Sequence, residues 1–190
     1  MNRIARFMRV SRERFEADWA DAFLGDSCPW ETLRLPERAT SGSAGYDFFA
    51  PAGFELAPGR TITIPTGVRA RIDEGWVLML FPRSGLGFKY RLQLNNTVGV
   101  VDSDYFGAKN EGHIFVRLTN AGDRPLRVGA GEAFAQGCSC PSVSPRTIMP
   151  TACAPAGSEA RIDEWEMENW KWGMGNGGAN PSGIRFDPIP

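Results

Sequence analysis

Hydrophobic and polar residues alternate in short runs from about residue 45 to residue 136. Turns that contain glycine or proline, such as APG, PTG, DEG and AGD, separate these runs. Alternation with a period of two is typical of β-strands that bury one face. The runs interpreted as strands are FELAPGR, TITIPTGVRARI, GWVLMLFPR, LQLNNTVGVV, HIFVRLTN and PLRVGAGEAFAQ. No helix-length periodic segment separates them, so the pattern predicts an all-β barrel or sandwich rather than a parallel α/β fold.

One segment before this region has a helical period. In residues 11–24, SRERFEADWADAFL, the aromatic side chains of Phe15, Trp19 and Phe23 fall on one face. Ser11 is a suitable N-cap for such a helix. We therefore expect a short N-terminal helix that packs on the main domain or on a neighbouring subunit.

The pattern divides the chain into three parts. Residues 1–30 form the expected N-terminal helical extension, and residues 31–137 form the β core. From residue 138 to residue 190 the alternation is lost, and prolines recur in PSVSPRTIMPTACAPAGSEAR. This last part is expected to be an irregular tail.

Composition limits the classes of function. The chain has 190 residues, 42% hydrophobic and 23% charged, which is ordinary for a single globular domain. A net charge of −1 provides no basic field for nucleic acid or for an anionic membrane. No apolar run approaches the roughly 20 residues that span a bilayer, and the N-terminus does not resemble a secretory signal. The expected location is the cytoplasm, with neither nucleic acid nor membrane as a partner.

Cysteine and histidine usage argues against several catalytic classes. The spacing of the four cysteines fits neither a zinc site nor a disulfide framework. The single histidine, His113, stands at the start of an apparent strand, where a solvated or structural role is the more common one. Any chemistry is therefore expected to use carboxylates, backbone amides, arginines and a metal ion held by the substrate.

Four short segments interrupt the strand pattern with polar residues and glycines. Each one alone is a weak indication, because acids, amides and glycines are common in turns. In chain order the segments are SAGYDFFA (43–50), FPRSGLGFKY (81–90), LNNTVGVVDSDYFG (94–107) and GEAFAQG (131–137).

The second and third segments carry groups suited to phosphate chemistry. Arg83 and Ser84 lie at a turn after a strand, where a guanidinium and backbone N–H groups can bind an anion. Gly99, flanked by valines, indicates a buried hairpin with a close backbone approach. Asp102 follows directly, and we expect it at the floor of a pocket, where a carboxylate can orient and deprotonate a water. Tyr105 offers a flat face to a sugar or a base.

The first and fourth segments add one polar side chain each. Asp47 precedes an apolar strand, and Gln136 offers an amide that can donate to a phosphate. Asp104 is an alternative acid in the third segment, with a role in the turn instead.

Taken together, AGYD, PRSGLG, NxxGVxDSDYxG and GExxAQ resemble motifs one to four of the trimeric dUTP diphosphatases, in the same order. The resemblance covers residues 43–137. It implies a β-barrel of jelly-roll type and a homotrimer in which each active site uses more than one subunit. A dCTP deaminase shares this fold but requires a glutamate base and an Arg-Ser-Ser turn, so Asp102 and the turn Arg83-Ser84-Gly85 favour the diphosphatase. A nucleotide-binding homologue without turnover is a further alternative.

The resemblance also implies residue roles. Asp102 is the general base that aligns the water attacking the α-phosphorus of dUTP, giving dUMP and pyrophosphate. Tyr105 packs beneath the deoxyribose, and Asp47 supports a Mg²⁺ ion that the triphosphate chelates. The remaining implied contacts are Asn96, Gly99 and Val101 to uracil, and Arg83, Ser84, Gly85 and Gln136 to the phosphates.

Two departures from the family pattern affect the core. Ala108–Gly112 lengthens the step from DSDYFG into the next strand and is interpreted as a loop insertion. Ala133 stands where the family motif usually has a basic residue after GE or GD. One phosphate or intersubunit contact is therefore expected to be absent or to come from elsewhere.

The family's fifth motif, Arg-x-Gly-Gly-Phe-Gly-Ser-Thr, has no counterpart in this chain. GMGNGGANPSG (173–183) comes nearest, but Met174 and Ala179 replace its arginine and phenylalanine. Codons compatible with residues 153–161, read one nucleotide earlier, permit such a motif followed by a stop. We hypothesise that the chain leaves its reading frame near Gly137, so that the core folds but catalysis is poor for want of the closing arm.

Overall fold

The computed structural model describes residues 4–23 and 27–142. Within these residues the chain forms two α-helices, two short 3-10 helices and eleven strands. The helical elements are α1 (Arg12–Ala22), η1 (Trp30–Thr32), α2 (Ser84–Tyr90) and η2 (Ser103–Gly107). The strands are β1 (Ala5–Arg9), β2 (Tyr46–Phe49), β3 (Phe54–Leu56), β4 (Thr61–Pro65), β5 (Val68–Ile72), β6 (Trp76–Pro82), β7 (Leu92–Leu94), β8 (Gly99–Val101), β9 (Phe115–Asn120), β10 (Leu126–Val128) and β11 (Ala133–Pro141).

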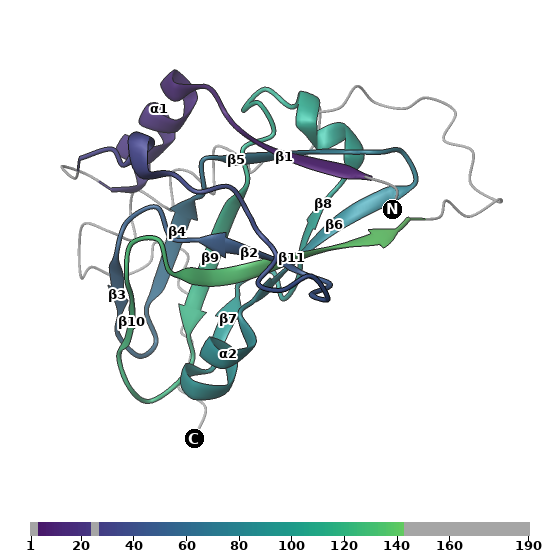
Figure 1. Cartoon of the computed structure of the whole chain (residues 1–190). Coiled ribbons are helices and arrows are strands. Elements are labelled where there is room, and N and C mark those ends of the chain that lie inside the picture. The colour runs from purple at the N-terminus through teal and green to yellow at the C-terminus, as the bar shows by residue number, and fades with distance from the viewer. Residues whose placement is uncertain (1–3, 24–26, 143–190) are drawn as a thin grey trace, which may run out of the picture. The chain divides into compact units, whose positions relative to one another are not determined.

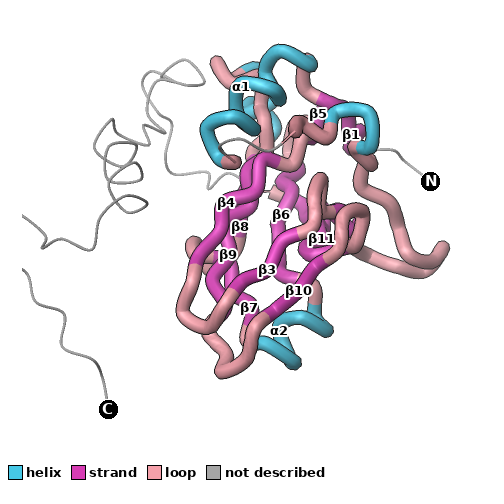
Figure 2. Tube along the Cα trace, turned by 90° about the vertical axis from the view of Figure 1, so that its left-hand side faces the viewer, coloured by secondary structure: helices cyan, strands magenta, loops and turns pink. Residues whose placement is uncertain are grey.

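All pairings between these strands are antiparallel. The largest sheet has four strands in the order β2-β11-β6-β8, and a second sheet has the order β4-β9-β7. Two strand pairs, β1-β5 and β10-β3, complete the arrangement. Figures 1 and 2 show α1 and α2 at opposite ends of these strands. The predicted all-β core with a short N-terminal helix is therefore confirmed.

The core consists of aliphatic and aromatic side chains from the inward faces of the strands. Alternation places Leu78 and Leu80 of β6 and Val116 and Leu118 of β9 in this core, each no more than 2% exposed. Burying one such side chain stabilises the fold by about 1.5–3 kcal/mol. The sheet that carries the candidate site therefore rests on a closely packed interior.

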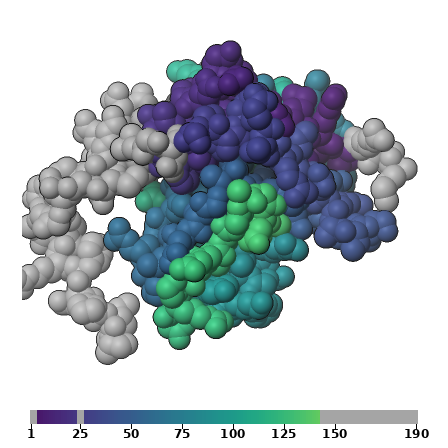
Figure 3. Space-filling view, turned by 60° about the vertical axis from the view of Figure 1, so that its left-hand side comes forward, coloured from purple at the N-terminus to yellow at the C-terminus, as the bar shows by residue number. Residues whose placement is uncertain are grey.

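The N-terminal helix has the predicted cap and the predicted buried face. Ser11 caps α1, its hydroxyl accepting a hydrogen bond from the Arg14 N–H at 3.1 Å. Phe15 and Trp19 are almost fully buried, in a second apolar cluster that includes Leu33. In Figure 3 the N-terminal segment, in purple, lies along the top of the molecule.

The expectation of a purely helical extension over residues 1–30 needs a correction. The segment begins with β1, which pairs with β5 from Ala5 opposite Ile72 to Arg9 opposite Val68. ARFMR has no clear alternation, so its strand character depends on the partner strand rather than on its own pattern.

Two further predictions about elements change. Residues 84–90 form α2 rather than a turn. The expected end of the core at Gly137 is too early, because β11 continues to Pro141 with Cys138 opposite Met79 and Cys140 opposite Val77. The loss of alternation had predicted irregular structure here, but pairing with β6 gives the backbone groups of these residues hydrogen-bond partners. The rest of the expected tail, residues 143–190, including the region of the proposed frame change, lies outside the described residues.

Candidate functional site

Three of the four motifs meet on adjacent strands of the four-stranded sheet. In this sheet β11 lies between β2 and β6, and Gln136 is paired with Asp47 on one side and with Phe81 on the other. The Gln136 side chain lies close to Gly45, where an added Cβ would be 3.4 Å from Gln136 Oε1. The first and fourth motifs are thus direct neighbours, although they are almost ninety residues apart in the chain.

Arg83 brings the second motif to the same place. Its backbone N–H donates to the Phe134 carbonyl at 3.1 Å, which ties the end of β6 to β11. An Arg83 guanidinium nitrogen lies 3.5 Å from a carboxylate oxygen of Asp47. Asp47 is mostly covered, whereas 44% of the Arg83 side chain is exposed. The Arg83 backbone is therefore bound to β11 and one guanidinium nitrogen lies near Asp47, while much of the side chain faces solvent. This geometry is suited to binding an anion.

Ser84 and Gly85, which follow Arg83, are both exposed. A Cβ added at Gly85 would meet no heavy atom within 4 Å. This part of the chain leaves its backbone accessible to a ligand. Asp47, Arg83, Ser84, Gly85 and Gln136 form what we call the arginine cluster.

The third motif forms a separate group around β8. Asn96 and Thr97 form the turn between β7 and β8, where Thr97 has φ 65° and the Val98 N–H donates to the Asn96 carbonyl at 2.7 Å. The predicted hairpin is wrong, because β7 pairs with β9 and β8 pairs with β6, in two different sheets. Asn96 is exposed at this turn. A Cβ added at Gly99 would lie 3.0 Å from Leu80 Cβ, so the predicted close approach is to the neighbouring strand β6.

Val101 and Asp102 differ sharply in exposure. The Val101 side chain lies in the hydrophobic core, so only its backbone can face a ligand. Asp102 is exposed and precedes η2 as its N-cap residue, with no capping hydrogen bond from its side chain. The expectation that Asp102 lies at the floor of a pocket is therefore wrong for the single chain. A strand that ends at the sheet edge delivers the following side chain to the surface.

Tyr105 lies in η2 and is half-buried, with its ring packed against the core cluster. The Tyr105 hydroxyl donates to the His113 carbonyl at 3.1 Å and accepts from Asn110 Nδ2 at 2.9 Å. Asn96, Gly99, Val101, Asp102 and Tyr105 form what we call the aspartate cluster.

The strand register keeps the two clusters apart within one chain. Val101 pairs with Leu78, near the start of β6, whereas Arg83 follows the end of β6 at Pro82. The five steps from Leu78 to Arg83 correspond to about 17 Å along an extended strand. This distance exceeds the combined length of an aspartate and an arginine side chain. The carboxylate of Asp102 and the guanidinium of Arg83 of one chain therefore do not converge on one phosphorus atom.

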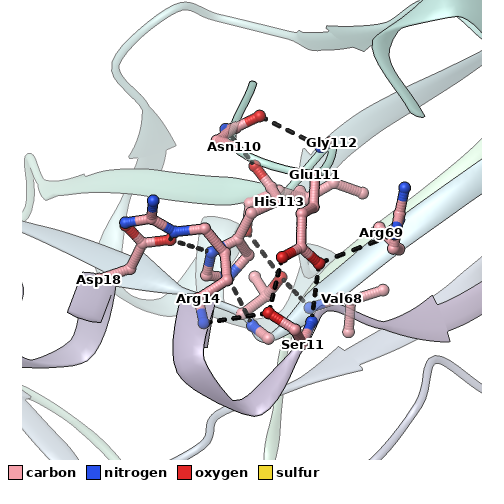
Figure 4. Close-up of polar contacts among 12 residues, drawn as sticks. Ser11, Arg14, Asp18, Val68, Arg69, Asn110, Glu111, Gly112 and His113 are labelled. Carbon is pink, nitrogen blue, oxygen red and sulfur yellow. Dashed lines mark hydrogen bonds and ion pairs between the residues drawn. The ribbon is translucent and has the colours of Figure 1, made fainter. Parts of the chain in front are cut away.

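A polar network that the motifs did not indicate joins α1 to the loop after η2. His113 is fully buried, with Nδ1 2.5 Å from an Asp18 carboxylate oxygen and Nε2 accepting from the Gly67 N–H at 2.8 Å. Because Nε2 is an acceptor, the proton lies on Nδ1, which donates to Asp18. Figure 4 shows this pair, with Arg14 also bound to Asp18. The histidine is structural, which is one of the two roles expected for it.

The carboxylates of this network are shifted toward their charged forms. Burial is the largest single influence on Asp18 and raises its pKa, but the hydrogen bonds and charges of His113 and Arg14 together lower it below the usual value. Hydrogen bonds from Ser11 to Glu111 lower the pKa of Glu111. No sequence motif indicated these residues, because Asp18 and His113 are 95 positions apart.

Clusters of metal-binding side chains and membrane-spanning helices are both absent from the described part of the chain. Residues 4–23 and 27–142 contain no group of three His, Cys, Asp or Glu side chains placed to hold a metal ion. In the same part of the chain, no helix is long and apolar enough to cross a membrane.

Comparison with known proteins identifies relatives of the whole core. A family model described as dUTPase matches residues 31–153. The deoxyuridine 5'-triphosphate nucleotidohydrolase of Mannheimia succiniciproducens is 42% identical over 119 residues, which are 61% of this chain and 72% of that protein. The protein of the same name from Lactococcus lactis is 40% identical over 110 residues, 57% of this chain and 73% of that protein.

Solved structures agree with the fold. The crystal structure of the dUTPase from Streptococcus mutans has a TM-score of 0.56 and 37% identity, covering 73% of this chain and 96% of that one. A dUTPase from phage phi11 of S. aureus, described with a structural Mg(II) ion, has a TM-score of 0.56 at 20% identity and covers 79% of this chain and 98% of that one. These neighbours are jelly-roll β folds, so the predicted fold class is confirmed.

Proposed function

The chain belongs to the dUTPase family, and on this premise we propose that it hydrolyses dUTP to dUMP and pyrophosphate. Such a reaction limits uracil incorporation into DNA and supplies dUMP for thymidylate synthesis. One observation carries the proposal: the residues implied by motifs one, two and four lie side by side as Asp47, Arg83 and Gln136. Motif three presents the exposed carboxylate of Asp102 at the end of β8.

In the proposed reaction Asp102 orients a water molecule and takes its proton. The water oxygen bonds to the α-phosphorus, the bond from that phosphorus to the bridging oxygen of the β-phosphate breaks, and pyrophosphate leaves with that oxygen. In phosphoryl transfer an enzyme mainly positions groups and neutralises charge, so one carboxylate base is sufficient. The exposure of Asp102 allows a water to approach it.

The arginine cluster is the proposed binding site for the phosphates. The Arg83 guanidinium has exposed N–H donors, and the accessible backbone at Ser84 and Gly85 offers further ones. Gln136 stands beside Asp47 and contributes an amide toward the far end of the triphosphate. Together these groups bind negative charge from several directions.

The aspartate cluster is the proposed binding site for the nucleoside. The turn at Asn96 offers an exposed side-chain amide and backbone groups to uracil. Gly99 and Val101 contribute backbone only, since one has no side chain and the other buries its own in the core. The ring of Tyr105 packs beneath the deoxyribose.

A Mg²⁺ ion bound to the triphosphate fits these residues. The described residues offer no three-ligand cluster, and Asp47 already faces Arg83, so phosphate oxygens are the natural ligands. Asp47 would act on the ion indirectly, through hydrogen bonds to its coordinated waters. When bound, the ion neutralises charge on the phosphates.

We further propose that the protein is a homotrimer in the cytoplasm. The separation of about 17 Å between Leu78 and Arg83 supports this, because the two clusters can meet at one nucleotide when different subunits supply them. The exposed apolar residues Phe88 in α2 and Val100 in β8 are available for a subunit contact. Nucleic acid and membrane are not proposed as partners.

Incubation with dUTP and dCTP tests the proposal against the deaminase of the same fold. We expect pyrophosphate from dUTP and no ammonia from dCTP. Ammonia release from dCTP without pyrophosphate from dUTP would overturn it. The turn Arg83-Ser84-Gly85 and the base Asp102 favour the first outcome.

A catalytically impaired homologue is the second candidate, favoured by Met174 and Ala179 at the positions of the fifth motif's arginine and phenylalanine. In that case the chain binds dUTP but releases pyrophosphate slowly, because no arm closes over the triphosphate. Sequencing the gene and its product across codons 130–165 tests the frame change that we propose as its cause, and nucleotides unable to encode the shifted motif would exclude it.

A further inference from the structure

The hydroxyl of Tyr105 lies within a closed set of hydrogen bonds. It donates to the His113 carbonyl at 3.1 Å and accepts from Asn110 Nδ2 at 2.9 Å. Asn110 Nδ2 also lies 3.3 Å from the same carbonyl, and Asn110 Oδ1 accepts from the Gly112 N–H at 3.1 Å. A backbone N–H can only donate and a carbonyl can only accept, so the orientation of the Asn110 amide is determined.

Asn110 belongs to the segment Ala108–Gly112, which folds back against η2. Gly112 has φ 69°, and an added Cβ would lie 2.7 Å from the Tyr105 carbonyl oxygen. A side chain at this position would therefore push the loop away from Tyr105. The segment contacts Tyr105 through both its backbone and the Asn110 side chain.

The residues on either side of Asn110 fix this segment to the rest of the protein. Glu111 accepts from the Ser11 N–H at 2.8 Å and from the Ser11 hydroxyl at 2.6 Å, at the N-cap of α1. Glu111 also lies 3.7 Å from Arg69, whose guanidinium donates to the Phe106 carbonyl at 2.6 Å. Figure 4 shows Glu111 between Ser11 and Arg69, with Asn110 bound to Gly112 beside them.

We propose that Asn110 is a positioning residue that fixes the Tyr105 ring and thereby sets the preference for a 2'-deoxy over a 2'-hydroxy nucleotide. The proposal rests on the proposed function, in which this ring packs against the sugar. The ring packs on the core, and its hydroxyl is held by Asn110 and the His113 carbonyl, so it cannot retreat from an additional oxygen on the sugar. Releasing the hydroxyl lets the ring move and lets a ribose enter.

The kinetic test compares kcat/KM for dUTP with kcat/KM for UTP. Asn110→Ala removes the donor to Tyr105, and Asn110→Asp removes it while keeping the acceptor for Gly112, in case the alanine variant folds poorly. The loss of one neutral hydrogen bond predicts a fall of about three- to tenfold in the dUTP/UTP ratio. Lys109→Ala, at the exposed neighbouring position, is the control and should leave the ratio unchanged.

A double-variant cycle shows whether Asn110 acts through the Tyr105 hydroxyl. Tyr105→Phe should lower the ratio by a similar factor, and adding Asn110→Ala to it should cause no further fall. A wild-type ratio in Asn110→Ala, or a fall that multiplies with that of Tyr105→Phe, would overturn the proposal.

A spectroscopic readout separates failure of this proposal from failure of the proposed function. The chain has three tyrosines, so ring-¹³C labelling gives few NMR signals, and loss of a signal in Tyr105→Phe assigns it. We expect the Tyr105 signal to shift or broaden in Asn110→Ala and not in Lys109→Ala, with the other two tyrosine signals unchanged. If the wild type releases no pyrophosphate from dUTP, the proposed function fails, whereas an unchanged Tyr105 signal in Asn110→Ala overturns the positioning role.

Discussion

At the scale of single residues, the proposed chemistry depends on which side chains are exposed and which are held by neighbouring groups. Asp102 is exposed at the end of a short strand, whereas Asp47 is covered and lies beside Arg83. These two acids therefore differ in accessibility: the Asp102 carboxylate is open to water, whereas the Asp47 carboxylate lies beside the Arg83 guanidinium.

Replacing Asp102 with alanine should reduce dUTP hydrolysis at least about 100-fold, because a general base contributes that much or more. Binding of a non-hydrolysable dUTP analogue should be largely retained, since the base acts on water. Asp104→Ala is the matched control at an exposed acid two positions away, and it should retain activity. Near-normal pyrophosphate release by Asp102→Ala would refute the assignment.

The sequence indicates some of the residues of the candidate site and does not indicate others. Asp47, Arg83, Asp102 and Gln136 stand in short contiguous patterns, which is why they were found. The contacts of Asn110 were not found, because they depend on how the loop after η2 folds back, and no local pattern encodes that.

At the scale of elements, β11 determines how the motifs meet. It pairs with β2 and with β6, so one strand carries Gln136 between Asp47 and Phe81. Gly137 lies at a point of close packing, where an added Cβ would be 2.9 Å from Leu78 and 3.0 Å from Phe48. The sequence predicted the strand through Gln136 but not its continuation. Residues 137–141 pair with β6, although they do not show the alternation of apolar and polar side chains that indicates a strand.

We expect Gly137→Ala to lower the free energy of unfolding by about 1–3 kcal/mol, the usual cost of overpacking a core. Denaturant unfolding measures this change. Gly42→Ala is the control, since a Cβ there would meet nothing within 4 Å, and it should change stability little. Equal stability of the two variants would contradict the packing that the structure shows around β11.

The helix α1 is joined to the core by the buried pair of Asp18 and His113 as well as by its aromatic face. The sequence predicted the helix from its period and cap, but a pair 95 positions apart leaves no local pattern. The free energy of unfolding of the protein should depend on pH in the acid range, because the folded protein holds the pKa of Asp18 below the usual value.

Asp18→Asn should lower the free energy of unfolding by about 1–2 kcal/mol near neutral pH, where the wild type has a charge-assisted hydrogen bond to His113. A depressed pKa contributes stability above the unfolded value of about 4, and that contribution disappears as pH falls through the lower folded value. The difference between wild type and variant, measured by denaturant unfolding, should therefore shrink below about pH 4. Glu111, whose pKa is also lowered, is present in both proteins, so its contribution to the difference between them largely cancels. A difference that is independent of pH would exclude this role for Asp18.

At the scale of the whole molecule, the central claim is that one active site combines the arginine cluster of one subunit with the aspartate cluster of another. The sequence predicted both clusters through its motifs. It contained no measure of the distance between them, which follows only from the pairing of β8 with β6.

Subunit complementation tests this claim most directly. Arg83→Ala and Asp102→Ala are each expected to be nearly inactive on dUTP, and co-expression of the two produces mixed trimers. With random assembly each site has one chance in two of an intact Arg83 and one in two of an intact Asp102, so about a quarter of the wild-type pyrophosphate release should return. Mixed protein no more active than its two parents would mean that both residues act from the same chain, and it would contradict the account.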